Sequence, residues 1–262
     1  MPRAQAPSLR HELIVAIAPV FLGGFLFTAL IETYKDDMTS RKDLVLDFYR
    51  PMRDQQAECR ATEQQLASAY QTEAGTYRLM LNELDHMVAA DPATRARGYE
   101  VLPQSLLESN SKVLAQIGEL APKLTLCTQV LYRKYEEVAL ATATYDEFTK
   151  IGEQRDAAVQ PLYGQRATLL NQLSNQFTSE SLMNTLRDSF LMNDDTADGR
   201  NAIKAKVHAI GDPAIGFYTQ LARNEADILK VEQEVDKKLI TLYAKKVNRR
   251  YERGVFSALW PW

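Results

Sequence analysis

Residues 13–31 read LIVAIAPVFLGGFLFTALI and contain no charged side chain. Glu12 precedes this stretch and Glu32 follows it. As an α-helix it would be about 28 Å long, which is close to the thickness of the hydrocarbon core of a bilayer. No later stretch of the sequence resembles it. The sequence therefore predicts one transmembrane helix at residues 13–31, to which the rest of the chain is attached.

Two other interpretations of this stretch fit less well. A cleaved signal peptide has an apolar core of about 7–15 residues and a small-residue cleavage site, whereas this core is longer and no Ala-x-Ala-like site follows it. A buried helix of a soluble domain would carry polar residues on one side, whereas residues 13–31 have no polar side. Pro19, Gly23 and Gly24 are compatible with a lipid-embedded helix, although the glycines form no small-xxx-small pair for close packing against a second span.

The charges that flank the predicted span leave its orientation open. Arg3 and Arg10 precede it, and Lys35, Arg41 and Lys42 follow it, so the positive-inside rule gives nearly a tie. We expect a short cytoplasmic N-terminal tail in a bacterial-type inner or plasma membrane, with the larger C-terminal part outside the cytoplasm.

The rest of the chain has the composition of a folded helical domain. The whole sequence has 262 residues and a net charge of −3, with 25% charged and 45% hydrophobic residues. The part after the span is rich in Ala, Leu, Gln, Glu, Lys and Arg, which favour helices, and no segment alternates as a strand does. Nucleic-acid-binding proteins are usually strongly basic, so we expect no nucleic-acid partner. The expected fold class is all-α.

Two long segments carry heptad patterns that are typical of helices packed at shallow angles, as in coiled coils. These patterns predict an elongated antiparallel bundle, whose apolar faces pack within the chain, against further copies of it, or against other protein subunits. The repeated positions are Ala67, Ala74, Leu81 and Val88 with Tyr70, Tyr77 and Leu84 in residues 52–90, and Leu221, Ile228, Val235 and Leu242 with Phe217, Val231 and Leu239 in residues 213–253.

Prolines, glycines and turn-forming residues predict where these helices are interrupted. The predicted interruptions are a hinge at Arg50 and Pro51, a connector over residues 91–103, breaks at Pro122 and near Pro161, a loop over residues 193–201 (NDDTADGRN), and a helix end at Gly211 before Asp212 and Pro213. The predicted organisation is an N-terminal tail (1–12), the span (13–31), a juxtamembrane connector (32–50), a helical bundle domain (51–253) and an aromatic C-terminal tail (254–262).

Cys59 and Cys127 are the two cysteines of the sequence. An even number of cysteines outside the cytoplasm often indicates a disulfide, and both residues lie beside apolar stripes of helices that are expected to be antiparallel. Spacing alone does not establish the geometry that a disulfide needs. Two buried free thiols are therefore the alternative, because cysteine is among the most buried residue types.

Candidate metal and catalytic motifs are incomplete. Glu83 and His86 have the E-x-x-H spacing of di-metal bundles, but no second such pair exists. Residues 194–205 begin like a calcium loop, but Ala205 occupies the position at which a bidentate Glu is needed. Nucleotide-binding and hydrolase motifs do not occur. We therefore expect no metal, no cofactor and no enzymatic activity.

A basic run followed by aromatic residues forms the last part of the sequence. Cations suit anionic lipid head groups and Trp suits the membrane interface, so this segment predicts contact with the membrane surface; docking of the aromatic residues on a partner protein is the alternative. The residues are Lys245, Lys246, Arg249, Arg250, Arg253, Phe256, Trp260 and Trp262.

Together these features predict a single-pass, membrane-anchored, non-enzymatic scaffold, structural component or sensor subunit of a membrane-associated complex. One alternative is a signalling or effector subunit in which the hinge at Arg50 and Pro51 relays binding of a ligand or partner to the span. A second alternative is an enzyme with an unrecognised site, which requires a polar, titratable cleft among the helices. A scaffold should form a defined oligomer, whereas a sensor should show a ligand-dependent shift in melting temperature.

Overall fold

The computed structural model describes residues 38–89, 92–176 and 196–252, together with residues 28, 31–33, 35 and 36. Its elements are a π-helical turn η1 (Leu44–Tyr49) and the α-helices α2 (Arg50–Ala89), α3 (Pro92–Ala141), α4 (Tyr145–Gln176) and α6 (Ala197–Glu252). Over these described ranges the chain contains no strand. The predicted all-α class is therefore confirmed.

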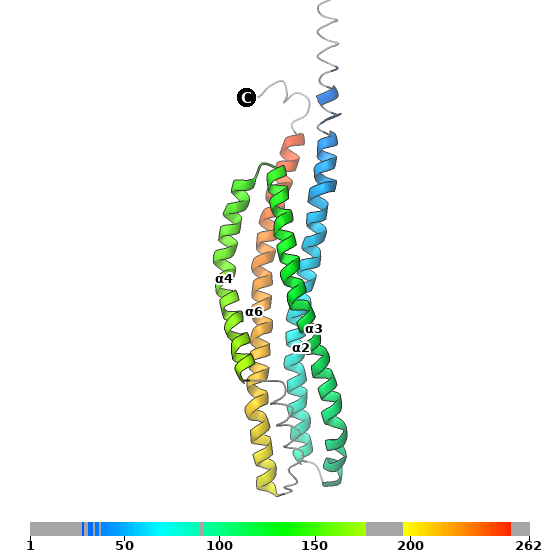
Figure 1. Ribbon diagram of the computed structural model, residues 1–262, viewed down its shortest axis with the longest axis vertical. Helices are drawn as coiled ribbons and strands as arrows, with labels where there is room; N and C mark the ends of the chain where they lie inside the picture. Colours follow the sequence, from blue (N-terminus) through cyan, green and yellow to red (C-terminus); the bar gives the residue numbers. More distant parts are fainter. Residues whose placement is uncertain are drawn as a thin grey trace, which may run out of the picture.

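The four long helices alternate in direction along an elongated bundle (Figure 1). Helix α2 packs against both α3 and α6, and α4 packs mainly against α6. Below the short turn that joins them, α3 and α4 diverge (Figure 1). The beginning of α2 and the end of α6 lie at the same end of the bundle, which is the upper end in Figure 1.

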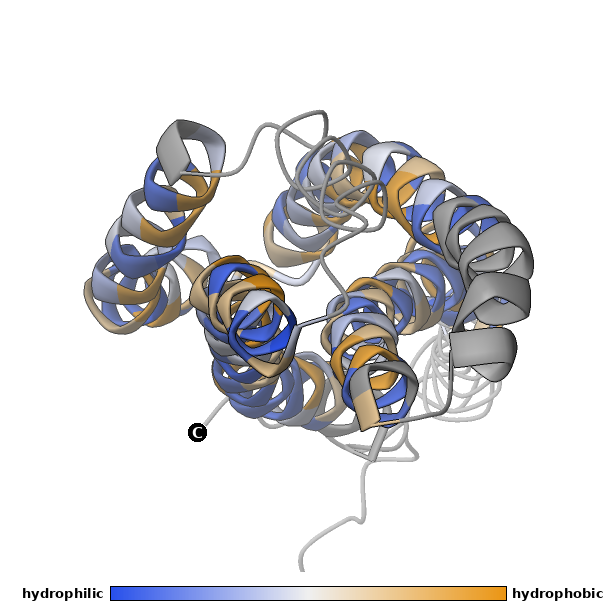
Figure 2. Ribbon diagram, turned by 90° about the horizontal axis from the view of Figure 1, so that it is seen from below, coloured by the Kyte–Doolittle hydropathy of each residue, from blue (hydrophilic) through white to orange (hydrophobic). Residues whose placement is uncertain are grey.

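Two apolar clusters fill the interior of the bundle at different heights. The cluster nearer the start of α2 contains Met52, Leu131 and Leu239, and the more distant one contains Leu81 and Leu221. Seen along the bundle, each helix carries both hydrophobic and hydrophilic residues (Figure 2). The predicted heptad residues Tyr70, Ala74, Leu81, Leu221 and Leu239 all belong to these clusters, so their faces are buried against other helices of the same chain.

Predicted interruptions at three prolines do not occur, because α3 runs through Pro122, α4 runs through Pro161, and α6 runs through Pro213. The connector predicted over residues 91–103 is helical from Pro92, where α3 begins. A proline inside a helix removes one backbone hydrogen bond and pushes away the carbonyl four residues earlier. These three prolines are exposed, so water can satisfy the freed carbonyls while the opposite face of each helix stays packed in the core.

The predicted helix end at Gly211 is also wrong, because this glycine serves close packing. A Cβ atom at Gly211 would lie 2.7 Å from Leu81 Cδ2 of α2. Asp212 does not cap a new helix, since its Oδ2 lies 3.1 Å from His208 Nδ1 within α6. The absence of a side chain at Gly211 therefore lets α2 and α6 approach one another.

The predicted loop over residues 193–201 is wrong for residues 197–201, which are helical. Helix α6 begins at Ala197, and Thr196 Oγ1 accepts a hydrogen bond from the Gly199 N–H group at 3.1 Å. This contact satisfies one of the N–H groups that a helix leaves unpaired at its first turn. Residues 193–195 lie outside the described residues.

The predicted helix break at Arg50 is replaced by a π-helical turn. Residues 38–43 are helical and lead into η1. Arg50 has helical angles (φ −65°, ψ −48°) and its N–H group donates to the Val45 carbonyl, five residues earlier. Because a π turn is wider than an α turn, it can accommodate the Pro51 ring, which would otherwise clash with the carbonyl four residues earlier. The helix therefore continues through Arg50 and Pro51.

The turn between α3 and α4 falls where the sequence carries no glycine or proline. Ala143 has a positive φ of 52°. The N–H of Thr144 donates to the Ala139 carbonyl at 2.8 Å, and the N–H of Ala143 donates to the Leu140 carbonyl at 3.2 Å. These two bonds define a Schellman helix end, in which glycine is the usual left-handed residue.

Replacing Ala143 with glycine is expected to stabilise the protein by about 1 kcal/mol, because an L-residue with a Cβ atom pays a penalty in the left-handed conformation. The matched control is Ala115→Gly in α3, where the residue is exposed and helical. That substitution should destabilise by about 1 kcal/mol. Urea unfolding curves of the two variants measure both effects, and a shift of the same sign in both would contradict the assignment of a strained turn.

The predicted transmembrane span at residues 13–31 lies outside the described residues except for Thr28 and Ile31, and residues 1–12 and 253–262 lie outside them as well. Arg253, Phe256, Trp260 and Trp262 are among these undescribed positions. None of the helices that the structure does describe is long and apolar enough to cross a membrane.

Candidate functional site: a buried charged layer beside a pocket

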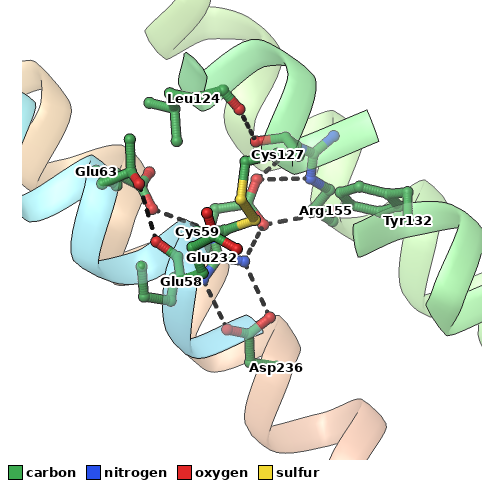
Figure 3. Close-up of polar contacts among 12 residues, drawn as sticks. Glu58, Cys59, Glu63, Leu124, Cys127, Tyr132, Arg155, Glu232 and Asp236 are labelled. Carbon is green, nitrogen blue, oxygen red and sulfur yellow. Dashed lines mark hydrogen bonds and ion pairs between the residues drawn. A yellow bond between two sulfur atoms is a disulfide. The ribbon is translucent and has the colours of Figure 1, made fainter. Parts of the chain in front are cut away.

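A disulfide joins α2 to α3 in the upper half of the bundle. Cys59 and Cys127 are covalently linked, with Cα atoms 5.5 Å apart (Figure 3). Both side chains are buried in the apolar cluster that also contains Leu131 and Tyr135. The structure therefore agrees with a disulfide and not with two free thiols. The bond fixes α2 and α3 beside the charged residues described next.

Arg60, one residue after Cys59, is the centre of a buried charged layer between the two apolar clusters. Its Nε lies 2.7 Å from Asp236 Oδ2, its Nη1 lies 2.9 Å from Glu63 Oε2, and its Nη2 lies 3.0 Å from Glu232 Oε2. Burial disfavours the charged guanidinium, but the three carboxylates, with Asp236 first, outweigh this effect and raise the pKa of Arg60. This charged layer holds α2 to α6.

Arg155 extends the charged layer to α4. Its Nε donates to Glu232 Oε1 at 2.9 Å, and its Nη2 donates to the same oxygen. The guanidinium also lies over the ring of Tyr132, 4.5 Å from the ring centroid. Tyr132 itself donates to Glu232 Oε2 at 3.3 Å, so Glu232 receives bonds from α2, α3 and α4 at once (Figure 3).

A pocket of about 570 Å³ lies beside this charged layer, lined by all four helices. Its volume is within the range of small-molecule sites, which combine apolar walls with a few polar groups. The apolar part of the wall includes Leu66, Leu124, Leu170 and Ile228, and the polar part includes Arg60, Glu63, Tyr70, Tyr132, Arg155, Tyr163, Arg166, Glu225 and Glu232.

Two carboxyl groups of the pocket, those of Glu63 and Glu225, have raised pKa values. Burial raises the pKa of Glu63 to about 7, although the charge of Arg60 opposes the shift. Burial also raises the pKa of Glu225, against the charge of Arg166. Arg166 Nη1 lies 3.0 Å from Glu225 Oε1, while Glu225 Oε2 is buried and has no hydrogen-bond partner within the described chain.

A third carboxyl group with a raised pKa, Glu73, is buried outside the pocket. Asn110 of α3 donates to Glu73 Oε1, and Glu73 Oε2 has no partner among the described residues. Burial raises the pKa of Glu73 from its ordinary value of 4.5 to about 7. Because the folded-state pKa is the higher one, the favourable contribution of Glu73 is present below about pH 4.5 and is lost as the pH rises through about 7.

Replacing Glu73 with glutamine should therefore stabilise the protein at pH 8 by about 2–3 kcal/mol and have little effect near pH 4.5. The melting temperatures of variant and wild type, measured between these two pH values, give the difference directly. Glu83→Gln, at an exposed position of the same helix, is the control and should give no such difference. A constant difference between Glu73→Gln and wild type at all pH values would contradict the burial of a titrating carboxyl group.

The described residues of the two incomplete metal motifs belong to different helices, α2 and α6. Glu83 and His86 are exposed, and Asp198 lies in the first turn of α6. His208 lies between Asp85 of α2 and Asp212, with its ring nitrogens 3.1 Å from an oxygen of each. The structure places no set of three metal-ligating side chains together in the ranges it describes.

The predicted surface-contact residues that the structure describes lie at the upper end of α6, beside the start of α2 (Figure 1). Lys245 is exposed, and Lys246 Nζ lies 3.6 Å from Glu147 Oε1 of α4. Arg249 and Arg250 belong to the same helix. The basic run therefore begins at the end of the bundle from which α2 leads back to the predicted span.

The residues of the charged layer and of the pocket were not recognised from the sequence as a site. The sequence did contain a signal, because Tyr218, Glu225, Glu232 and Leu239 follow one another at intervals of seven residues. All four are buried in the structure. Acidic residues inside an otherwise apolar heptad column indicate buried charges that need partners.

Comparisons of the chain with protein-family models, with curated proteins and with solved structures find no match.

Proposed function

We propose that the chain is a single-pass membrane-anchored subunit of a membrane-associated complex, whose helical bundle is a non-enzymatic sensor domain outside the cytoplasm. The continuity of α2 carries the proposal. This helix lines the pocket with Arg60, Glu63 and Tyr70, and helical structure continues from it through η1 back to residue 38. The element that would sense a bound molecule thus leads directly toward the predicted span.

Two further features support this proposal. The disulfide between Cys59 and Cys127 favours an oxidising compartment, because disulfides are rare in the reducing cytosol. The basic end of α6 lies at the same end of the bundle as η1 (Figure 1). If η1 faces the membrane, the predicted aromatic tail follows α6 at the lipid surface, where cations and Trp are favourable.

The charged layer provides a route for the signalling alternative. A molecule that changes the separation of α3 and α4 would displace Arg155, which shares Glu232 with Arg60 of α2. The change would then act on α2 through charged contacts that are costly to break because they are buried. The π-helical turn of η1 lies between this region and the predicted span, and such turns often occur at functional positions.

One observation favours the enzyme alternative: Glu63 and Glu225 line the pocket, and burial raises the pKa of both carboxyl groups. Carboxyl groups of this kind are candidates for general acid or base catalysis. Chemical conversion of a bound molecule by the purified protein, and its loss in Glu63→Gln, would favour an enzyme over a sensor.

A labelling experiment tests the anchoring and the orientation. Lys238 is exposed on α6, whereas both native cysteines are buried and disulfide-bonded. We expect a membrane-impermeant maleimide to label Lys238→Cys in intact spheroplasts, and the protein to stay with the membranes until detergent is added. Wild-type protein is the control for the native cysteines. Labelling only after lysis would contradict the extracytoplasmic bundle, and release by an alkaline wash would contradict the span.

A further inference from the structure

Glu225 is the incompletely paired charge of the pocket. Its side chain is fully buried. Arg166 occupies one carboxylate oxygen, and the other oxygen, Oε2, has no partner in the described part of the chain. By contrast, Glu232 accepts bonds from Arg60, Arg155 and Tyr132. A buried acceptor without a donor is unfavourable, so Glu225 Oε2 is the position at which a ligand with a donor group would gain most.

The charges of the site indicate the sign of that donor group. Arg166 is already engaged, because it pairs with Glu225 and its guanidinium lies over the Tyr163 ring, 4.9 Å from the ring centroid. In the charged layer and the pocket wall together, three guanidinium groups meet four carboxyl groups. The two sets are Arg60, Arg155 and Arg166, and Glu63, Glu225, Glu232 and Asp236. With all four carboxyl groups ionised, the site lacks one positive charge, which a monocationic ligand would supply. Burial raises the pKa of Glu63 and of Glu225, and binding of such a cation would favour their ionised forms.

The remaining walls indicate the body of the ligand. Leu66, Leu124, Leu170 and Ile228 line the pocket together with Tyr70. Such a wall favours an apolar body, because burial of apolar surface is favourable. Leu66 and Ile228 are themselves almost fully buried, which places the apolar floor of the pocket between α2 and α6.

We propose that the pocket between α2, α3, α4 and α6 binds a small primary amine with an apolar body, whose ammonium group donates to Glu225 Oε2. This inference rests on the sensor function proposed above and names the class of its ligand. The ammonium group completes the pairing of Glu225, and the apolar body covers the leucines and the isoleucine of the wall.

Matched probes test the proposal on the full-length protein in detergent. Propyl, hexyl and 2-phenylethyl bodies are each compared as the amine, the alcohol and the carboxylate by calorimetry at constant ionic strength. We expect at least one amine to bind more than tenfold tighter than its alcohol, since a charge-assisted hydrogen bond is the stronger one. The carboxylates should not bind. Failure of every amine to bind, or equal binding of amine and carboxylate, overturns the proposal.

Variants then locate the interaction. Glu225→Gln should weaken the amine at least tenfold and leave the alcohol unchanged, whereas Glu234→Gln, exposed on the same helix, should leave the amine unchanged. Thr125→Trp places a bulky side chain at an exposed position of the pocket wall and should abolish amine binding even if Glu225→Gln does not fold. Undiminished amine binding in Thr125→Trp, or in folded Glu225→Gln, overturns the proposal.

The two proposals fail separately. Labelling of Lys238→Cys only after lysis, with selective amine binding intact, overturns the location of the sensor domain and leaves the ligand class standing. Labelling in intact spheroplasts without selective amine binding overturns the ligand class alone.

Discussion

Replacing Arg60 with methionine is expected to lower the melting temperature of the bundle by about 10 °C. Methionine replaces the apolar stem of the arginine with a side chain of similar length, but it leaves Glu63, Glu232 and Asp236 without the cation that they share. Removing one partner of a buried ion pair costs about 3–5 kcal/mol, and for a domain of this size each kcal/mol corresponds to about 2–4 °C. Thermal unfolding of the purified protein, followed by circular dichroism, measures the change.

The control for this prediction is Arg78→Met. Arg78 is exposed on the same helix and donates to Thr219 Oγ1 at 3.2 Å, so its loss should change the stability by about 0.5 kcal/mol or less. Neutralising the carboxyl groups that pair with Arg60 but not with Arg155 should also rescue the first variant. Arg60→Met combined with Glu63→Gln and Asp236→Asn should therefore melt higher than Arg60→Met alone, while Glu232 keeps its pairing with Arg155. A melting temperature of Arg60→Met close to that of the wild type would show that the carboxylates find other partners.

Reduction of the disulfide between Cys59 and Cys127 is expected to lower the free energy of unfolding by about 4 kcal/mol. The two cysteines are separated by 68 residues, and a loop of this length restricts the unfolded chain strongly in the chain-entropy account. Urea unfolding with and without reductant measures the difference. The same treatment should reduce the cooperativity between α2 and α3, since the bond joins these helices at the height of the charged layer.

The matched variant for the disulfide is Cys59→Ala combined with Cys127→Ala. Its stability in urea should be close to that of the reduced wild type and should not change when reductant is added. If reductant destabilises this variant as much as the wild type, the effect does not come from the disulfide.

The helical class and the two best-patterned helices could be predicted from the sequence because their apolar residues repeat over many turns. Leu221 and Leu239 lie in the core as their spacing indicates. The charged layer could not be predicted in the same way, because a Glu at a core position resembles a solvated one until its partner is known. Arg60 and Glu232 are separated by 172 residues, and only the packing of α2 on α6 brings them together.

Helix ends were the other difficulty, and both kinds of error have a physical cause. Pro122, Pro161 and Pro213 lie on exposed faces, where the loss of one hydrogen bond is compensated by water and by the packed side of the helix. The turn at Ala143 was missed because it contains no glycine. Two backbone hydrogen bonds hold an alanine there in a conformation that glycine usually adopts. Local residue preferences therefore predicted breaks that packing removes, and missed one that backbone hydrogen bonds create.

The π-helical turn before Pro51 has a consequence for the angular phase of the helix. A π turn holds one residue more than an α turn, and one residue corresponds to a rotation of about 100° around the helix axis and a rise of about 1.5 Å. The side chains of residues 38–43 therefore point in directions turned by about 100° from those that the α2 heptad would give them. Conversion of η1 to a regular α-helix would rotate this upstream segment relative to the bundle while changing its height very little. A signal carried by this conversion would therefore be mainly a rotation and only to a small extent a displacement along the helix axis.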